Sequence, residues 1–300
     1  MQHRKHLAGL EAYAQAGTAT PAGAHHCTPP YLTRGLGMLL FFLGAQPLQA
    51  AESFQATSLS LGYSFNAKED VLYGTGTSNN KAVVGQFEHF STWGYGGNYF
   101  DFEAYHGKNI GDIPALSSHG VNAGSFGSST SQTYLAIYNG RLSAGRLSGR
   151  SLAWGPVKDL YAAARLEGSN YANYRAAMLG LSVDLDVPGA SFFETDLYIR
   201  SAQFTGNTNA APNLFSRTYA VFPFRINGMN LSWQPLLLLN FRRDGRGTEV
   251  YFRPDLWVDI PGTSLSLGFR PDVHLFGKLP SEGGGRYRRI TPTFLARWTF

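Results

Sequence analysis

The last eleven residues of the chain alternate between two chemically different faces. On one face of an extended strand the residues are apolar: Ile290, Pro292, Phe294, Ala296, Trp298 and Phe300. On the other face they are mostly hydroxylated or charged: Thr291, Thr293, Arg297 and Thr299. Because successive side chains of a strand point to opposite faces, this segment predicts a strand between an apolar and a polar environment. The last strand of a soluble sandwich would alternate in the same way.

A two-faced strand that ends on an aromatic residue resembles the C-terminal assembly signal of bacterial outer-membrane barrels. The residues that match the signal are Phe294, Trp298 and Phe300. The resemblance implies insertion into a bacterial outer membrane by the barrel assembly machinery, with outer-membrane lipid around the folded chain.

Composition favours a single β structure. The 300 residues include 35 Gly, 21 Phe and 16 Tyr, and only 15% are charged. After residue 50, no stretch reaches the roughly 18 to 20 consecutive apolar residues that a membrane helix needs. A membrane-spanning chain without such helices must form a closed barrel, because lipid offers no other partners for the backbone N–H and C=O groups.

The first 50 residues read as a leader that contains a secretory signal peptide. Arg34 precedes a short apolar run, residues 36–45, and Ala50 offers a small residue for cleavage before Ala51. Residues 1–33 make an unusually long n-region, which favours a start nearer residue 32. The only cysteine, Cys27, falls in this leader. We therefore expect two parts: a leader, residues 1–50, and an outer-membrane β-barrel, residues 51–300.

The charge of the barrel part is nearly balanced. Without the leader, 22 basic and 19 acidic residues remain, which leaves a net charge of +3. This balance argues against a nucleic-acid partner and gives no strong indication of an anion pore.

Alternating segments divide the barrel part into twelve expected strands. Their approximate ranges are 58–66, 82–93, 98–107, 131–142, 150–167, 174–185, 193–200, 214–226, 229–242, 248–260, 263–276 and 290–300. The connections alternate between short ones, such as Asn227-Gly228, and long ones, such as 107–130. An even number of strands with short turns at one end and long loops at the other is typical of bacterial outer-membrane barrels. The sequence therefore predicts an all-β fold, a 12-stranded antiparallel transmembrane β-barrel.

Five prolines stand against this interpretation, because each removes a backbone donor inside an expected strand. They are Pro223, Pro235, Pro254, Pro271 and Pro292. Prolines are normally confined to edges or bulges, and a closed barrel has no edge. We therefore expect bulges or shifted strand boundaries at these positions.

If the apolar positions face lipid, the opposite set lines a lumen of mixed chemistry. The acids of this set are Glu88, Asp101, Glu103, Asp159, Glu194, Asp196, Asp255 and Asp259. Its bases are Arg165, Arg200, Arg253, Arg270 and Arg297, and its aromatic residues are Tyr105, Tyr161, Tyr198, Tyr251 and Trp257. Such charges either pair across strands and fill a small barrel or line a narrow channel. In a channel, the mixture would suit neutral ring-bearing solutes such as nucleosides, since a base stacks on aromatic rings and a ribose bonds to carboxylates.

Three stretches of the chain are similar to the Tsx family of nucleoside-specific channel-forming outer-membrane proteins, including its OmpK branch. They are residues 87–100, with Glu88-His89 and Trp93; residues 155–161, with Gly155-Pro156 and Tyr161; and residues 180–188. The order and spacing match over residues 55–300. The chain departs from the family at Gly97, Ile137, Asn139, Val157 and Leu160, where acidic or aromatic residues are usual.

The resemblance implies a passive channel for nucleosides and deoxynucleosides that phages or colicins also use as a receptor. Combined with the face assignment, it predicts these substrate contacts in the lumen: Glu88, Asp101, Glu103, Tyr105, Glu194, Asp196, Tyr198 and Arg200. No cofactor, metal ligand or catalytic residue is expected.

Other classes of barrel stay open. A general or sugar-specific small porin would share the architecture. A barrel enzyme of the lipase type requires a Ser-His pair, and His89, His106, His119 and His274 show no recognisable partner in the sequence. A structural barrel with a plugged lumen would pass no solute.

Overall fold

The computed structural model describes residues 54–67, 80–107, 132–170, 174–204, 207–241, 248–276 and 287–300. The expected leader, residues 1–50, lies outside the described residues, and so do most of the long connections. No helix in the described ranges is long and apolar enough to cross a membrane.

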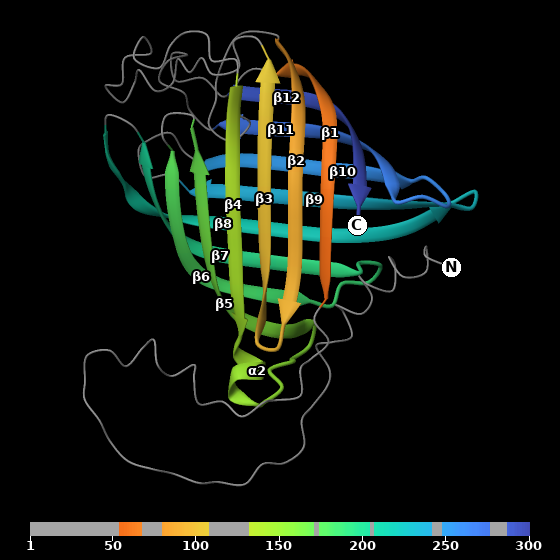
Figure 1. The fold of residues 1–300 in the computed structure, drawn as a ribbon. Helices are drawn as coiled ribbons and strands as arrows, with labels where there is room; N and C mark the ends of the chain where they lie inside the picture. The colour runs from red at the N-terminus through yellow and green to blue at the C-terminus, as the bar shows by residue number, and fades with distance from the viewer. Residues whose placement is uncertain are drawn as a thin grey trace, which may run out of the picture.

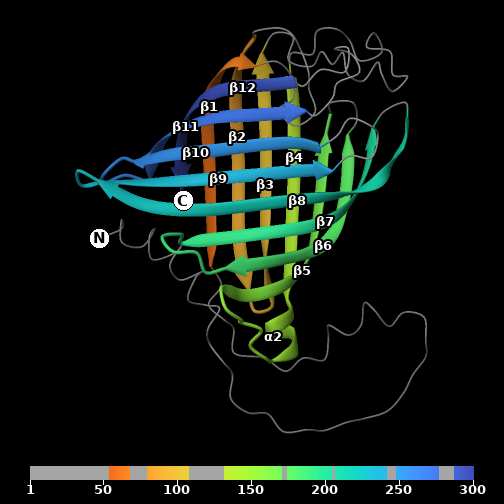
Figure 2. The same ribbon diagram turned by 180° about the vertical axis from the view of Figure 1, so that it is seen from behind.

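Twelve antiparallel strands form a closed barrel, which confirms the expected fold class. Each strand pairs with its neighbours in sequence, and β1 closes the barrel against β12. In Figure 1, β1 to β4 cross steeply in front of the strands behind them, and Figure 2 shows the reverse side. Such crossing follows from the tilt that closure requires. The strands are β1 (Gln55–Ala67), β2 (Asn80–Trp93), β3 (Gly96–Gly107), β4 (Gln132–Ser143), β5 (Val157–Ser169), β6 (Arg175–Leu185), β7 (Phe192–Phe204), β8 (Asn207–Ile226), β9 (Met229–Phe241), β10 (Thr248–Asp259), β11 (Leu265–Phe276) and β12 (Tyr287–Thr299).

The two faces of each strand lie in different surroundings, as the alternation predicts. In β1, Leu59 and Leu61 are 50% and 64% exposed on the outer surface, whereas Ser58 and Ser60 are buried inside. In β12, Phe294 and Trp298 are exposed outside and Thr293 is buried inside. The barrel is therefore apolar outside and largely polar inside, which inverts the arrangement of a soluble protein.

Tight turns join the strands at one end of the barrel. Asn227 and Gly228 both have positive φ, 50° and 81°, as a two-residue hairpin turn of type I′ requires. Gly189 and Gly262 also have positive φ in the turns after β6 and β10. These positions suit glycine because it has no Cβ to clash.

The connection between β4 and β5 corrects the expected start of the fifth strand at residue 150. Ser143 caps a short helix, α2 (Ala144–Ser148), and Gly149 ends it with a φ of 65°. Gly155, with a φ of 54°, then turns the chain before β5 begins at Val157. The helix lies at the end of the barrel where β2 turns into β3, and Arg146 donates to the Trp93 carbonyl there (Figure 1).

The eighth strand is longer than expected. It begins at Asn207 rather than at residue 214, so residues 207–213, which lie between the expected strands, continue the pairing with β7. The register shifts twice along this extension, between Arg200 and Ala202 and between Ala202 and Phe204.

The prolines lie within continuous strands, and the expected bulges are wrong at these positions. Pro235 pairs with Pro254, and Pro271 pairs with Pro292. The pairs Phe252–Val273 and Leu256–Phe269 share one register, which sets Pro254 opposite Pro271. No pairing is formed at residues 253–255 between β10 and β11, so the barrel accommodates the missing donors as a local gap in one ladder.

Candidate functional site

The candidate site is a narrow cavity inside the barrel with a volume of about 80 Å³. This is smaller than the roughly 300–1000 Å³ of small-molecule sites, so side chains fill most of the lumen. Nine strands, all except β1, β6 and β11, contribute to its lining. The lining combines carboxylates, arginines and aromatic rings, which is the mixture that the inward positions predict.

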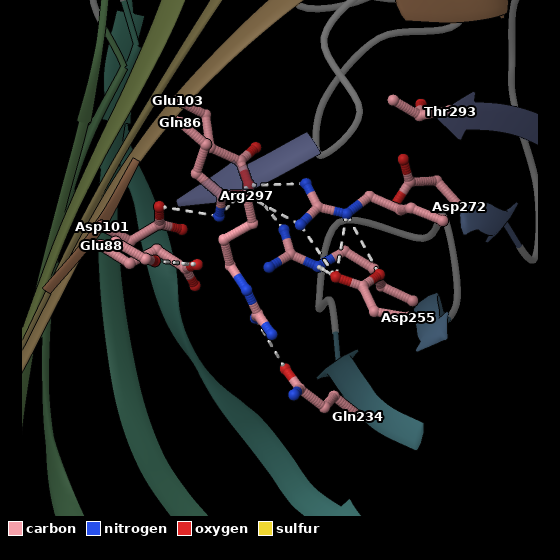
Figure 3. Close-up of polar contacts among 12 residues, drawn as sticks. Gln86, Glu88, Asp101, Glu103, Gln234, Asp255, Asp272, Thr293 and Arg297 are labelled. Atoms are coloured by element: carbon pink, nitrogen blue, oxygen red, sulfur yellow. Dashed lines mark hydrogen bonds and ion pairs between the residues drawn. The ribbon is translucent and has the colours of Figure 1, made fainter. Parts of the chain in front are cut away.

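One ion-pair network crosses the interior between β10, β11 and β3. Arg253 of β10 donates to Glu103 of β3 at 2.6 Å across the lumen. Around the barrel wall, β10 and β3 are separated by β11, β12, β1 and β2. Arg270 bonds to Asp255 at 2.8 Å and to the side-chain oxygen of Gln86 at 2.8 Å (Figure 3). The network therefore ties opposite walls together and occupies part of the lumen.

A second network joins β4, β6, β7 and β8. Arg141 contacts Asp184 at 2.6 Å and Glu194 at 2.7 Å. Arg217 contacts Glu194 and lies 2.8 Å from Asp196. All five side chains are buried or nearly so, so each charge depends on the others for compensation.

Glu88 and Asp101 form an acidic pair that makes no direct ion pair with an arginine within the described residues. They lie opposite each other on β2 and β3. Glu88 accepts from the Tyr99 hydroxyl at 2.9 Å and from Ser58 at 3.3 Å, and Asp101 accepts from the Gln86 amide at 3.1 Å. Both line the cavity, and Figure 3 shows them side by side. The hydrogen-bond donors that contact the two carboxylates are neutral groups.

Arg297 is the lining arginine without an ion pair in the described part of the chain. Its guanidinium lies 3.9 Å from the centre of the Trp257 ring and 3.3 Å from the Gln234 oxygen (Figure 3). Trp257 in turn packs over Gly268, where a Cβ atom would lie 2.5 Å from the ring. Glycine at this position therefore gives the ring its place against the wall.

An apolar cluster occupies the part of the interior nearer the long connections. It contains Leu135, Ile137, Ala163, Tyr174, Ala176, Met178, Tyr198, Ala202, Phe215, Leu238 and Tyr251. Leu135, Ile137 and Leu238 also line the cavity, so the cluster bounds the polar space on this side. Charged side chains lie beside the cluster, because Glu167 accepts from the hydroxyl of Tyr174 and Arg200 donates to the same hydroxyl. Apolar and charged groups are therefore mixed in this part of the lumen.

The structure brings five of the eight predicted contact residues to the cavity lining: Glu88, Asp101, Glu103, Tyr105 and Glu194. The other three, Asp196, Tyr198 and Arg200, are buried inside the barrel without lining the cavity. Asp196 bonds to Arg217, Tyr198 bonds to Asn139 at 2.8 Å, and Arg200 bonds to Tyr174 at 2.9 Å. Phe294, Trp298 and Phe300, which are expected to form an assembly signal, are all exposed on the outer surface.

Sequence reasoning missed several lining residues. Arg217 lies on the inward parity of the expected strand 214–226, so face assignment alone would have found it. Leu236 and Leu238 share the inward parity of β9 with Gln234, but apolar residues were assigned to lipid. Arg141 shares the inward parity of Leu135 and Ile137 on β4, and its contact with Glu194 depends on how β4 and β7 face each other.

The described residues contain no group of three or more His, Cys, Asp or Glu side chains placed to hold a metal ion. His274 contacts a carboxylate, Glu249, at 2.8 Å, and His89 contacts Thr57 at 2.9 Å. These partners are not the serine hydroxyl of the lipase type.

Comparison with known proteins gives distant structural likenesses. No protein-family model matches the chain. No curated protein sequence matches it significantly. Among solved structures, the chain is similar to CdiB from Acinetobacter baumannii, with 10% identity, a TM-score of 0.36 and coverage of 82% of this chain. It spans 60% of that CdiB chain.

Two further likenesses span nearly the whole of the other chain. A bacterial polysaccharide outer membrane secretin has 8% identity and a TM-score of 0.38, with coverage of 82% of this chain and 98% of the secretin. The outer membrane channel DcaP of Acinetobacter baumannii has 9% identity and a TM-score of 0.35, with coverage of 83% and 97%.

The fold and the site together define a class. The chain is a closed 12-stranded antiparallel barrel with an apolar outer surface and a charged, partly hollow interior. This is the architecture of transmembrane β-barrels. What such a barrel does depends on its own side chains.

Proposed function

We propose that the chain is a passive channel of the bacterial outer membrane, selective for nucleosides or similar small ring-bearing polar solutes. The observation that carries the proposal is the cavity lined by charges and aromatic rings inside a barrel whose outer surface is apolar. A solute gradient drives transport, and the proposal includes no cofactor and no catalytic step.

The chemistry of the lining supports a ring-bearing permeant. Tyr99 and Tyr219 offer aromatic surfaces, on which a planar base stacks. The carboxylates of Glu88 and Asp101 accept hydrogen bonds from the hydroxyl groups of a sugar.

Eight residues carry the proposed site in two roles. Glu88, Asp101, Glu103, Tyr105 and Glu194 line the cavity and would contact the solute. Asp196, Tyr198 and Arg200 would support that lining from behind. Tyr198, for example, holds the lining residue Asn139 through a 2.8 Å hydrogen bond.

The remaining partners follow from the outer surface. We propose that outer-membrane lipid covers the exposed apolar residues and that the barrel assembly machinery reads Phe294, Trp298 and Phe300, which point outward. Nucleic acid is not a proposed partner. Phage or colicin binding would fall to the long connections, which lie mostly outside the described residues.

A plugged structural barrel is the second candidate. The apolar cluster inside the lumen favours it, because Leu135, Ile137 and Leu238 narrow the path toward the long connections. Hydrophobic constrictions can close a pore by excluding water.

Liposome swelling separates these functions. Vesicles that hold the folded protein are placed in adenosine, in thymidine and in a sugar of equal size. We expect faster swelling with both nucleosides, because the sugar has no base to stack. Equal rates would favour a general or sugar-specific porin, and the absence of swelling would favour the plugged barrel.

A matched pair of variants on β4 tests whether the solute passes through the lumen. Ile137 lines the cavity and its neighbour Tyr138 is 42% exposed on the outer surface. Ile137→Trp should slow swelling, since the larger ring fills the cavity, whereas Tyr138→Trp should leave the rate unchanged. Heat-modifiable migration on gels verifies that both variants are folded, and equal rates in the two would contradict a lumenal path.

A further inference from the structure

We infer that this pore prefers cations to anions and that Glu88 and Asp101 set the preference. The inference rests on the proposed channel function and deepens it, because it adds the charge of the permeant to its size and shape. The class of permeant that it favours is a small cation, inorganic or organic, such as an amine-bearing solute.

The interior of the barrel carries more acid than base, although the whole chain has a net charge of +5. Among the described residues, ten carboxylates but six arginines are buried. The fold therefore gathers negative charge around the lumen. Acidic residues around a pore raise the local concentration of cations and exclude anions.

Most lining carboxylates have a cationic partner. Glu103 lies 2.6 Å from Arg253 and 3.4 Å from Arg270. Asp255 lies 2.8 Å from Arg270, and Glu194 lies 2.7 Å from Arg141. These pairs compensate one another inside the wall and leave little charge for a passing ion.

Glu88 and Asp101 differ because their hydrogen-bond partners in the described structure are the neutral groups of Tyr99, Ser58 and Gln86. Asp101 is 3% exposed, so water solvates its charge poorly. Two adjacent carboxylates that make no direct ion pair in the described structure attract a mobile cation at the wall of a cavity, because the attraction is stronger in a medium of low dielectric constant.

Arg297 does not neutralise this pair. Its guanidinium lies over the Trp257 ring and reaches Gln234 (Figure 3), and it forms no ion pair with Glu88 or Asp101 in the described structure. Among the lining residues that make no ion pair in the described chain, two are acids, Glu88 and Asp101, and one is an arginine, Arg297. Negative charge is therefore in excess in this group.

A buried donor in the same cavity is a second sign of a ligand. Trp257 is 1% exposed, and its indole N–H has no partner within the described structure. It lines the cavity with Arg297 and Gln234. A permeant that presents an amine to the acidic pair and an oxygen acceptor to this donor would satisfy both groups.

The reversal potential across a planar lipid bilayer under a KCl gradient tests the inference. We expect the sign that K⁺ permeation gives, and we expect a shift toward zero in the double variant Glu88→Gln with Asp101→Asn. Both substitutions keep the side-chain length and an oxygen that accepts the existing hydrogen bonds. The matched control is Asp272→Asn, which removes a buried interior carboxylate that does not line the cavity, and it should keep most of the potential.

Each outcome decides a different point. A zero or anion-directed potential would overturn the inference while the channel proposal stands. The wild-type potential in the double variant would overturn the assignment to Glu88 and Asp101. Folded protein that passes no current would overturn the channel and the inference together. If the double variant does not fold, Glu88→Gln alone, which keeps Asp101 intact, should give a smaller shift of the same sign.

Discussion

Trp257 keeps its place in the cavity wall because residue 268 on the neighbouring strand has no side chain. The ring packs over Gly268 and carries the Arg297 guanidinium 3.9 Å from its centre. A stack of this kind contributes about 0.5–2 kcal/mol. One glycine therefore positions both an aromatic surface and a cation in the lumen.

Gly268→Ala should destabilise the barrel, because the new Cβ would lie 2.5 Å from the Trp257 ring. Overpacking of this kind costs about 1–3 kcal/mol. The free energy of unfolding, measured by denaturant titration of the protein in lipid vesicles, checks the loss. Gly85→Ala is the matched control, since no atom lies within 4 Å of a Cβ there. Equal effects in the two variants would mean that Gly268 has no packing role.

At the scale of elements, four adjacent strands carry a row of prolines at one level of the barrel. Pro235, Pro254, Pro271 and Pro292 lie in matched register on β9, β10, β11 and β12. In an antiparallel sheet the N–H and C=O of one residue both point to the same neighbouring strand. A residue therefore forms a hydrogen-bonded pair with the strand on one side and a pair without hydrogen bonds with the strand on the other side. Pairing is therefore kept at Pro235–Pro254 and Pro271–Pro292 and lost where Pro254 faces Pro271.

Replacing Pro254 and Pro271 by valine should stabilise the barrel, because each valine adds a backbone donor opposite a carbonyl that receives none from proline. Each new bond should contribute about 0.5–1.5 kcal/mol, and the double variant should gain more than either single variant. Denaturant titration checks the gain. Leu256→Val changes a side chain on the same outer face without adding a donor, so it should bring no gain. An equal gain in that control would contradict the hydrogen-bond explanation.

At the scale of the molecule, closure sorts the side chains by environment. Leu179 and Leu181 are 71% and 68% exposed on the outside of β6, whereas the ion pairs of the interior are almost fully buried. The outer surface can face only a medium that accepts apolar side chains, and the interior keeps its charges because they compensate one another.

Leu179→Arg should cost about 2–4 kcal/mol of stability in lipid vesicles if this surface meets the hydrocarbon core, because the residue lies near the middle of β6. Trp154→Arg, at the short-turn end and 82% exposed, should cost only about 0–1 kcal/mol. Unfolding titrations of both variants give the comparison. A Leu179→Arg variant as stable as the wild type would show that lipid does not cover this face.

The sequence determined the features that depend on neighbouring residues along the chain. Alternation predicted the faces of β7 and β12, and the turn residues Asn227 and Gly228 predicted a hairpin that the structure confirms. These features could be read from the chain because side-chain direction in a strand repeats every two residues. The same reading misplaced the start of β5, because the caps of a helix as short as α2 resemble ordinary turn residues.

Only the tertiary structure decided which side chains meet inside the barrel. Glu103 and Arg253 are 150 residues apart, and Gln86 and Arg270 are 184 apart. Their contacts depend on the stagger and tilt with which twelve strands close, which a local pattern does not encode. Closure also left Glu88 and Asp101 without a direct ion pair in the described structure, and it placed Leu236 and Leu238 at the wall of the cavity. The position of a residue along its strand fixes which face it occupies, whereas the opposite wall of the barrel fixes which side chain it meets.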